Sequence, residues 1–308
     1  MRIPFRERAP EMGLESFPEK GLFRYSDRFG EVVYRQLSTM FVPLPSNESP
    51  HETDNQITPL IAIFTKPADS IGYTYCGYVS DIYQFIGNEV LNQQIVDSIL
   101  EVGIPILNQN TILSNNLTMM RNEIIIQNGE HVPEVGDVLP VMVVNNNYNG
   151  NRAASVSFGI STYVNRDRVV FSFNLGEMRQ VHIANSDTQM SSVVSSYMEM
   201  FSGSIFDLIE QNFRSILTEE QMLGTLDLIE KVGMRRREEI TKILQELNPP
   251  SEGEDPPLPS AWQMFLAIVR YSSFEQNLNA KRLLENAAES VLVIPPRMYE
   301  VLERLQSS

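Results

Sequence analysis

Apolar and polar residues alternate along much of the first half of the chain, and this pattern predicts short β-strands. The five apolar residues of 60–64 form a run with the length of a buried strand. Residues 71–79 alternate, so a regular strand would carry Tyr73 and Tyr75 on one face and Tyr78 on the other. We therefore expect the first strands of a sheet within the first 80 residues.

A second group of strands follows, and its clearest member is a hairpin. Residues 154–164 alternate between apolar and polar side chains, and residues 168–174 repeat the pattern. The segment Asn165-Arg166-Asp167 between them favours a turn, so 153–175 is predicted to be a β-hairpin. Shorter strands are predicted over 111–113, 124–127 and 138–145.

Helical spacing of apolar residues appears once within this region and then dominates the rest of the chain. Residues 82–102 have it, and Gly87-Asn88 is expected to divide them into two helices. A long helix is predicted to start near Asp187. Residues 218–221 match a capping box, and Ser260 is suited to cap a later helix, because both offer a hydroxyl to the free N–H groups of a first helical turn.

These elements predict an α+β protein with a mixed, mostly antiparallel sheet and helices, followed by a C-terminal helical region. We expect three parts: an N-terminal arm over 1–45, a β-rich α+β core over 46–182 and a helical region over 183–308. Within the last part, residues 248–259 hold five prolines in 12 positions, which is typical of a stiff, exposed linker.

The net charge of the chain limits which partners it can bind. The 308 residues carry a net charge of −15, and residues 41–150 have two basic side chains against 12 acidic ones. Residues 151–182 carry an excess of two positive charges. A chain this acidic is not expected to coat duplex DNA, but a local basic strip can still face a polyanion.

Location is limited by what the sequence lacks. No run approaches the ~20 apolar residues of a membrane span. The single cysteine, Cys76, permits no intrachain disulfide, which favours a reducing compartment. We expect a cytoplasmic location and no contact with a membrane.

Catalytic chemistry has little support in the sequence. The three histidines are far apart and no CxxC motif occurs, so neither a metal site nor a cofactor is predicted. Cys76 lies in an apolar strand without a basic neighbour, which favours a small core residue over a nucleophile. We predict that the protein is not an enzyme, although clustered carboxylates holding a divalent ion stay open as a third hypothesis.

The candidate site residues lie around the basic segment. Four arginines would contact phosphates, His182 would add a further donor, and Tyr148, in the Asn-rich turn before the segment, would stack on a base. The alternatives are ion pairs with nearby acids for the arginines, a structural role for His182 and packing over the sheet rim for Tyr148. The predicted nucleic-acid contacts are Tyr148, Arg152, Arg166, Arg168, Arg179 and His182.

The order of several short motifs resembles a phage- and plasmid-like family of unknown function, catalogued as domain nine-three-two. The resemblance covers about residues 70–292, and its motifs match Tyr78-Val79-Ser80-Asp81-Ile82-Tyr83, Gly136-Asp137-Val138, Asn146-Asn147-Tyr148-Asn149-Gly150 and Arg179-Gln180-Val181-His182. The family's Cys-x-Asn-Gly-like element has no cysteine here, where the chain reads Phe171-Ser172-Phe173-Asn174-Leu175-Gly176. The resemblance implies a bacterial cell that carries a phage or another mobile element.

Two functions are compatible with these observations. The first is a non-catalytic phage or mobile-element protein that binds or anneals single-stranded DNA as a homo-oligomer. The second is a structural or assembly protein of a phage particle, or a protein-interaction module, that contacts other phage proteins and is found in the virion. The basic segment favours the first, and the acidic bulk with its Pro-rich linker favours the second.

Overall fold

The protein forms two compact units. The computed structural model describes residues 5–17, 22–36, 60–80, 85–114, 116–133, 135–148, 154–164, 166–173, 178–179, 187–250 and 256–307. The first unit takes residues 1–93, 113–120 and 146–153, and the second takes 94–112, 121–145 and 154–308. The predicted division at residues 45 and 182 does not match this packing, because the second unit combines strands of the predicted core with the C-terminal helices.

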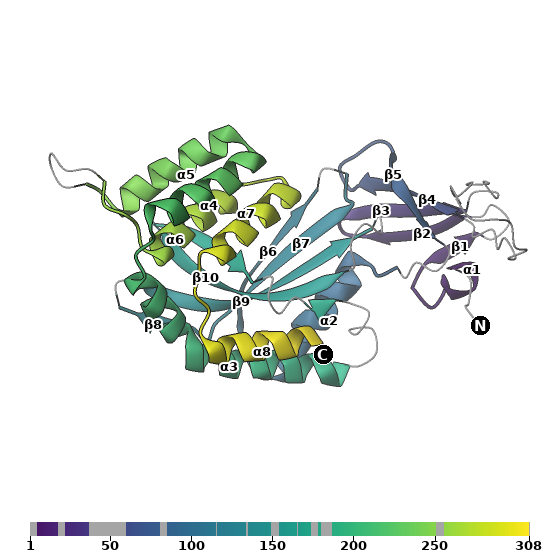
Figure 1. Ribbon diagram of the computed structural model, residues 1–308. Coiled ribbons are helices and arrows are strands. Elements are labelled where there is room, and N and C mark those ends of the chain that lie inside the picture. Colours follow the sequence, from purple (N-terminus) through teal and green to yellow (C-terminus); the bar gives the residue numbers. More distant parts are fainter. Residues whose placement is uncertain are drawn as a thin grey trace, which may run out of the picture. The chain divides into compact units, whose positions relative to one another are not determined.

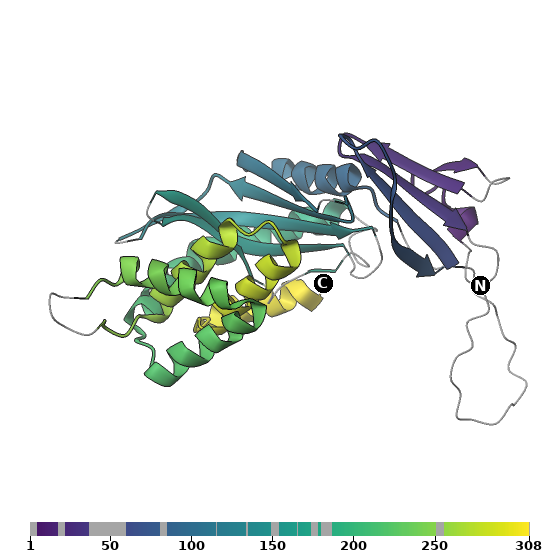
Figure 2. The same cartoon turned by 90° about the horizontal axis from the view of Figure 1, so that it is seen from above.

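The first unit is built on a five-stranded antiparallel sheet, whose strands follow one another in chain order (Figure 2). The segment predicted to be an arm therefore contributes three strands and a short helix. The elements are α1 (Phe5–Arg8), β1 (Glu15–Phe17), β2 (Leu22–Asp27), β3 (Gly30–Gln36), β4 (Leu60–Pro67) and β5 (Thr74–Ser80).

One face of this sheet carries the core of the first unit. Phe23, Tyr34 and Ile63 alternate inward from three neighbouring strands and are buried. They pack with Phe85 and Tyr148, which lie outside the sheet in sequence. Because side chains alternate across a strand, the residues between these positions lie on the opposite face.

A β-bulge in β5 changes which face Tyr78 occupies. Phe64 of β4 pairs with Tyr75, but the next residue, Ile63, pairs with Gly77, so the register shifts by one residue. Gly77 has a φ of 137°, a conformation that glycine adopts without a Cβ penalty. The prediction that Tyr78 lies opposite to Tyr73 and Tyr75 is therefore wrong, because a one-residue shift moves every later side chain to the other face.

The second unit holds a larger antiparallel sheet (Figure 1). Its main strands run in the order β11-β10-β9-β7-β6, while β8 pairs with β9 and β12 pairs with β10. The predicted hairpin is confirmed by the antiparallel pairing of β10 with β11. The strands are β6 (Ile106–Leu113), β7 (Met119–Ile126), β8 (Glu130–Val132), β9 (Gly136–Asn147), β10 (Ser155–Val164), β11 (Asp167–Ser172) and β12 (Met178–Arg179).

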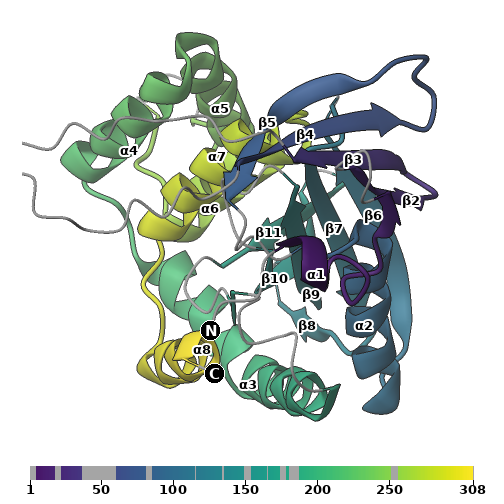
Figure 3. The same cartoon turned by 90° about the vertical axis from the view of Figure 1, so that its right-hand side faces the viewer.

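Helices pack on both sides of the larger sheet. Helices α3 and α8 lie side by side below it, and α4–α7 form a group above it (Figures 1 and 3). The predicted caps are confirmed, because Thr218 and Ser260 each form a capping box. The helices are α2 (Asn88–Glu101), α3 (Asp187–Arg214), α4 (Glu219–Val232), α5 (Met234–Leu247), α6 (Ala261–Ser273), α7 (Leu278–Ser290) and α8 (Pro296–Ser307).

The fold is α+β, as the alternation and periodicity predict, with two antiparallel sheets and mostly C-terminal helices. Among the helices that the structure describes, none combines the length and the apolar character needed to cross a membrane.

Candidate nucleic-acid interface

Among the described residues, the predicted cationic side chains do not share one end of the sheet. Arg166 and Arg168 lie at the tight end of the β10–β11 hairpin, where the Cζ atom of Arg168 is 5.4 Å from the ring centroid of Tyr163. Arg179 pairs with Ser155 at the other end of β10, whereas Arg168 pairs with Tyr163. Ser155 and Tyr163 are eight positions apart in the strand, which corresponds to about 27 Å between the two ends. Arg152 and His182 lie outside the described residues.

Tyr148 packs inside the first unit, and the base-stacking role predicted for it is wrong. Its side chain is 1% exposed, and its ring stacks on Phe85 with 5.4 Å between the centroids. The backbone N–H of Asn88 donates to the Tyr148 hydroxyl oxygen at 2.8 Å, which anchors the start of α2. A ring this buried has no face open to a nucleobase, so Tyr148 belongs to the packing alternative.

The face of the first sheet opposite to its core carries exposed aromatic rings. Tyr73, Tyr75 and Tyr78 are 49%, 56% and 60% exposed, and Phe17 at the other edge of the sheet is 37% exposed. Phe64 lies between them on β4 and approaches Tyr75 with 5.7 Å between ring centroids. The three tyrosines therefore face away from the core of the first unit.

Strand pairing orders this face into rows that run across the strands. One row reads Phe17, Leu22, Arg35, Ala62 and Tyr78 from β1 to β5. The next row, one side-chain repeat along the strands, reads Glu15, Arg24, Val33, Phe64 and Tyr75. Each row thus combines aromatic rings with one arginine. We call this surface the aromatic face.

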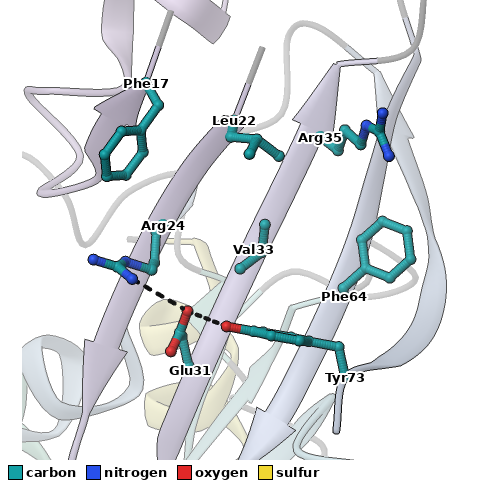
Figure 4. A pocket seen from close by; sticks show the side chains of 8 residues that line it. All are labelled: Phe17, Leu22, Arg24, Glu31, Val33, Arg35, Phe64 and Tyr73. Atoms are coloured by element: carbon teal, nitrogen blue, oxygen red, sulfur yellow. Dashed lines mark hydrogen bonds and ion pairs between the residues drawn. The ribbon is translucent and has the colours of Figure 1, made fainter. Parts of the chain in front are cut away.

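A pocket of about 460 Å³ opens in the aromatic face (Figure 4). Leu22 and Val33 form its apolar centre, with Phe17 on one side and Phe64 on the other. This volume lies in the range of small-molecule sites, which are mostly apolar with a few placed polar groups. The remaining lining residues are Arg24, Glu31, Arg35 and Tyr73.

Glu31 holds two of these polar groups at one end of the pocket. It accepts a hydrogen bond from the Tyr73 hydroxyl and lies 3.8 Å from a guanidinium nitrogen of Arg24. Arg24 also pairs with Glu15 at 2.6 Å, so its charge is compensated twice. The bond to Glu31 raises the pKa of Tyr73 above its ordinary value, which keeps the phenol protonated as a donor.

Two other cations on this face lack a carboxylate partner among the residues described here. Arg35 is exposed at the far end of the pocket and makes neither a hydrogen bond nor an ion pair within that part of the chain (Figure 4). The Nζ atom of Lys66 lies 5.9 Å from the ring centroid of Tyr73, within cation–π range. Both charges are available to an anionic ligand.

Most of this site does not follow from the sequence. The segment predicted to be an arm supplies Phe17, Arg24 and Arg35 from the short strands β1–β3, and the apolar run 60–64 gives no sign that Phe64 lines a pocket. The signal that could have found them is the β-branched and aromatic stretch 32–34 between Glu31 and Arg35, which is typical of a strand. Pairing across five strands cannot be read from that stretch alone.

Other chemistry is sparse in the described part of the chain. It contains no group of three or more histidine, cysteine or acidic side chains placed to hold a metal ion. Cys76 lies partly buried on the core face, with its Sγ atom 3.0 Å from the Thr65 hydroxyl. Comparison of the chain with protein-family models, with curated proteins and with solved structures finds no match. The resemblance to the phage- and plasmid-like family therefore stays a prediction.

Proposed function

We propose that the protein binds single-stranded nucleic acid on the aromatic face of its first unit. The observation that carries the proposal is the row of exposed rings interleaved with Arg24, Arg35 and Lys66. Stacking on aromatic side chains holds bases of any sequence, and cations beside the rings hold the phosphates. This proposal places the binding site on the N-terminal sheet, whereas the sequence alone favours the basic segment 151–182.

The charge on this face suits a nucleic-acid strand better than the net charge of the whole chain does. Among the described residues, its three cations, Arg24, Arg35 and Lys66, meet two carboxylates, Glu15 and Glu31, whereas the chain as a whole carries −15. Phosphates will therefore be attracted locally and repelled elsewhere, and binding will weaken quickly as salt rises. For about two phosphate contacts, at Arg35 and Lys66, the logarithm of the binding constant falls with the logarithm of the salt concentration with a slope near −1.4.

The test is a fluorescence-anisotropy titration of a labelled single-stranded oligonucleotide at low and moderate salt. Tyr75→Ala and Tyr78→Ala each remove one exposed ring, and each is expected to weaken binding about five-fold or more, because base stacking contributes about 1–3 kcal/mol per base. Tyr299→Ala is the matched control, since it removes an exposed tyrosine from α8. Binding that is absent at low salt, or equally affected by all three variants, contradicts the proposal.

Arg35 provides a second, electrostatic test. Arg35→Gln is expected to lower affinity and to reduce the salt slope by about 0.7, since one phosphate contact is lost. Arg235→Gln is its control, because Arg235 is also exposed and makes no ion pair with a described residue. An unchanged slope for Arg35→Gln counts against phosphate binding at this position.

The wider setting stays a proposal as well. We infer that the protein acts without catalysis in a cell that carries a phage or mobile element, and that strand binding or annealing involves several copies of the chain. If oligonucleotide binding is absent, the predicted role in particle assembly becomes the leading account, and mass spectrometry of purified particles tests it.

A further inference from the structure

The pocket in the aromatic face is chemically asymmetric along β3. At one end stands the carboxylate of Glu31, and at the other stands the exposed guanidinium of Arg35. Arg35 lies four positions after Glu31 in the strand, which corresponds to about 14 Å along the backbone. A ligand that fills the pocket thus meets a hydrogen-bond acceptor at one end and, at the other, a positive charge that no described residue compensates.

The acceptor end has capacity left for a ligand. An ionised carboxylate offers about four lone-pair sites, and Glu31 uses one for the Tyr73 hydroxyl and faces Arg24 at 3.8 Å. The same carboxylate repels phosphate, and the charge of Arg24 is compensated by Glu15. A donor group of the ligand is therefore favoured at this end, and its phosphate is favoured at Arg35.

A nucleotide has this polarity when its base carries an exocyclic amino group. Cytosine offers N4 and adenine offers N6 as donors, and carboxylates accept from such groups. Thymine instead presents the O4 acceptor at the corresponding edge, which a carboxylate repels. The apolar centre made by Leu22 and Val33, with Phe17 and Phe64 beside it, suits the faces of a planar base.

We propose that the pocket takes one base of the bound strand, directs its amino group at Glu31 and holds its phosphate at Arg35, so that the protein prefers cytosine or adenine to thymine. The inference rests on the proposed function, because it assigns one subsite of the aromatic face. Tyr75 and Tyr78 lie on β5 and do not line the pocket, so they stack on other bases without selecting among them.

The test compares oligo-dC with oligo-dT, each of about 12 nucleotides, in anisotropy titrations at one salt concentration. Wild-type protein is expected to bind oligo-dC about five-fold more tightly, in keeping with a single base-edge contact. Glu31→Gln exposes an amide N–H₂ beside the remaining oxygen, so this variant is expected to lose or reverse the preference.

Glu15→Gln is the matched control, because Glu15 also pairs with Arg24 and lies on the same face but does not line the pocket. It is expected to keep the preference for oligo-dC. Glu31→Asp keeps the charge and withdraws it by one methylene group, so it is expected to reduce the preference even if Glu31→Gln folds poorly. Circular dichroism of each variant separates misfolding from lost selectivity.

The outcomes separate this inference from the proposed function. Equal affinity of the wild type for oligo-dC and oligo-dT overturns the base contact and leaves strand binding standing. An equal loss of preference in Glu15→Gln and Glu31→Gln also overturns it, because the effect would then come from the shared partner Arg24. Absence of binding to both oligonucleotides overturns the proposed function itself.

Discussion

At the scale of single residues, the structure uses charge in two different ways. On the aromatic face, Arg35 is exposed and uncompensated by the described residues, which suits a ligand contact. In the second unit, Arg121 is buried and lies 2.6 Å from Glu285 and 2.8 Å from Glu123. Lys281 completes this group at 3.1 Å from Glu123. The first arrangement suits the ligand contact proposed for Arg35, and the second joins β7 to α7.

Removing one charge from the buried group is expected to destabilise the second unit. Glu285→Gln leaves Arg121 and Lys281 facing a single carboxylate, Glu123, and an uncompensated buried charge costs about 3–5 kcal/mol of unfolding free energy. Urea denaturation measures the loss. Glu238→Gln, at an exposed position on α5, is the control and is expected to change stability by less than about 0.5 kcal/mol. Equal effects of the two variants would contradict the structural role of the buried group.

The buried group also shows how neighbours set a pKa. Burial alone would raise the pKa of Glu123, but the adjacent charges of Arg121 and Lys281 lower it below its ordinary value. Glu123 thus stays ionised, and it also accepts a hydrogen bond from Asn110 at 3.3 Å. This network is a structural feature rather than part of the aromatic face.

A partly buried ion pair makes stability depend on pH. Glu275 accepts from the Asn277 backbone N–H and from Arg236, which lies 2.6 Å away, and these bonds lower the pKa of Glu275 although burial opposes them. A carboxylate with a lowered folded pKa stabilises the fold above its unfolded pKa, and that stability is lost as pH falls. We expect the gap in unfolding free energy between wild type and Glu275→Gln to shrink below about pH 4.5. Urea unfolding across pH 3–7 tests this, and a constant gap would contradict it.

At the scale of elements, the bulge in β5 matters most for the site. It turns Tyr78 to the side of Tyr75, because Gly77 absorbs the extra residue with a φ of 137°. Without the bulge, Tyr78 would point to the core face of the sheet and would be absent from the aromatic face. The aromatic face thus depends on one backbone position that carries no side chain.

Gly77→Ala is expected to cost about 1–3 kcal/mol of stability, because a Cβ atom is strained at this φ. It is also expected to weaken oligonucleotide binding, since relief of the strain shifts Tyr78. Gly72→Ala is the control, because Gly72 precedes the same strand and a Cβ there meets no atom within 4 Å. Thermal unfolding and anisotropy measure both effects, and equal results for the two variants would be evidence against the bulge.

The sequence predicts elements well where the signal is local. The β10–β11 hairpin and the caps at Thr218 and Ser260 follow from alternation and from hydroxyl groups beside a first helical turn. The bulge at Gly77 does not follow, because a register shift depends on pairing with β4. The burial of Tyr148 depends in the same way on Phe85, which lies far from it in the chain. Local patterns thus predict strands and helices, whereas the interface comes from pairing between strands.

At the scale of the whole molecule, a strongly acidic chain carries a small mixed-charge surface with exposed rings. The net charge of −15 disfavours contact with nucleic acid over most of the molecule. In the proposed account, Arg35 and Lys66 attract a nucleic-acid strand to the aromatic face, because neither has a carboxylate partner among the described residues. Self-association stays a prediction, and sedimentation equilibrium of the full chain tests it, with a mass above the 35.1 kDa of one chain as the expected result.

The most direct test of the account asks where a bound strand touches the chain. Ultraviolet crosslinking of the full-length protein to a single-stranded oligonucleotide, followed by mass spectrometry, maps that contact. The account predicts crosslinks in the peptide that contains Tyr73, Tyr75 and Tyr78, with none at the β10–β11 hairpin beside Tyr163. Crosslinks confined to the hairpin, or an absence of crosslinks at low salt, would contradict it.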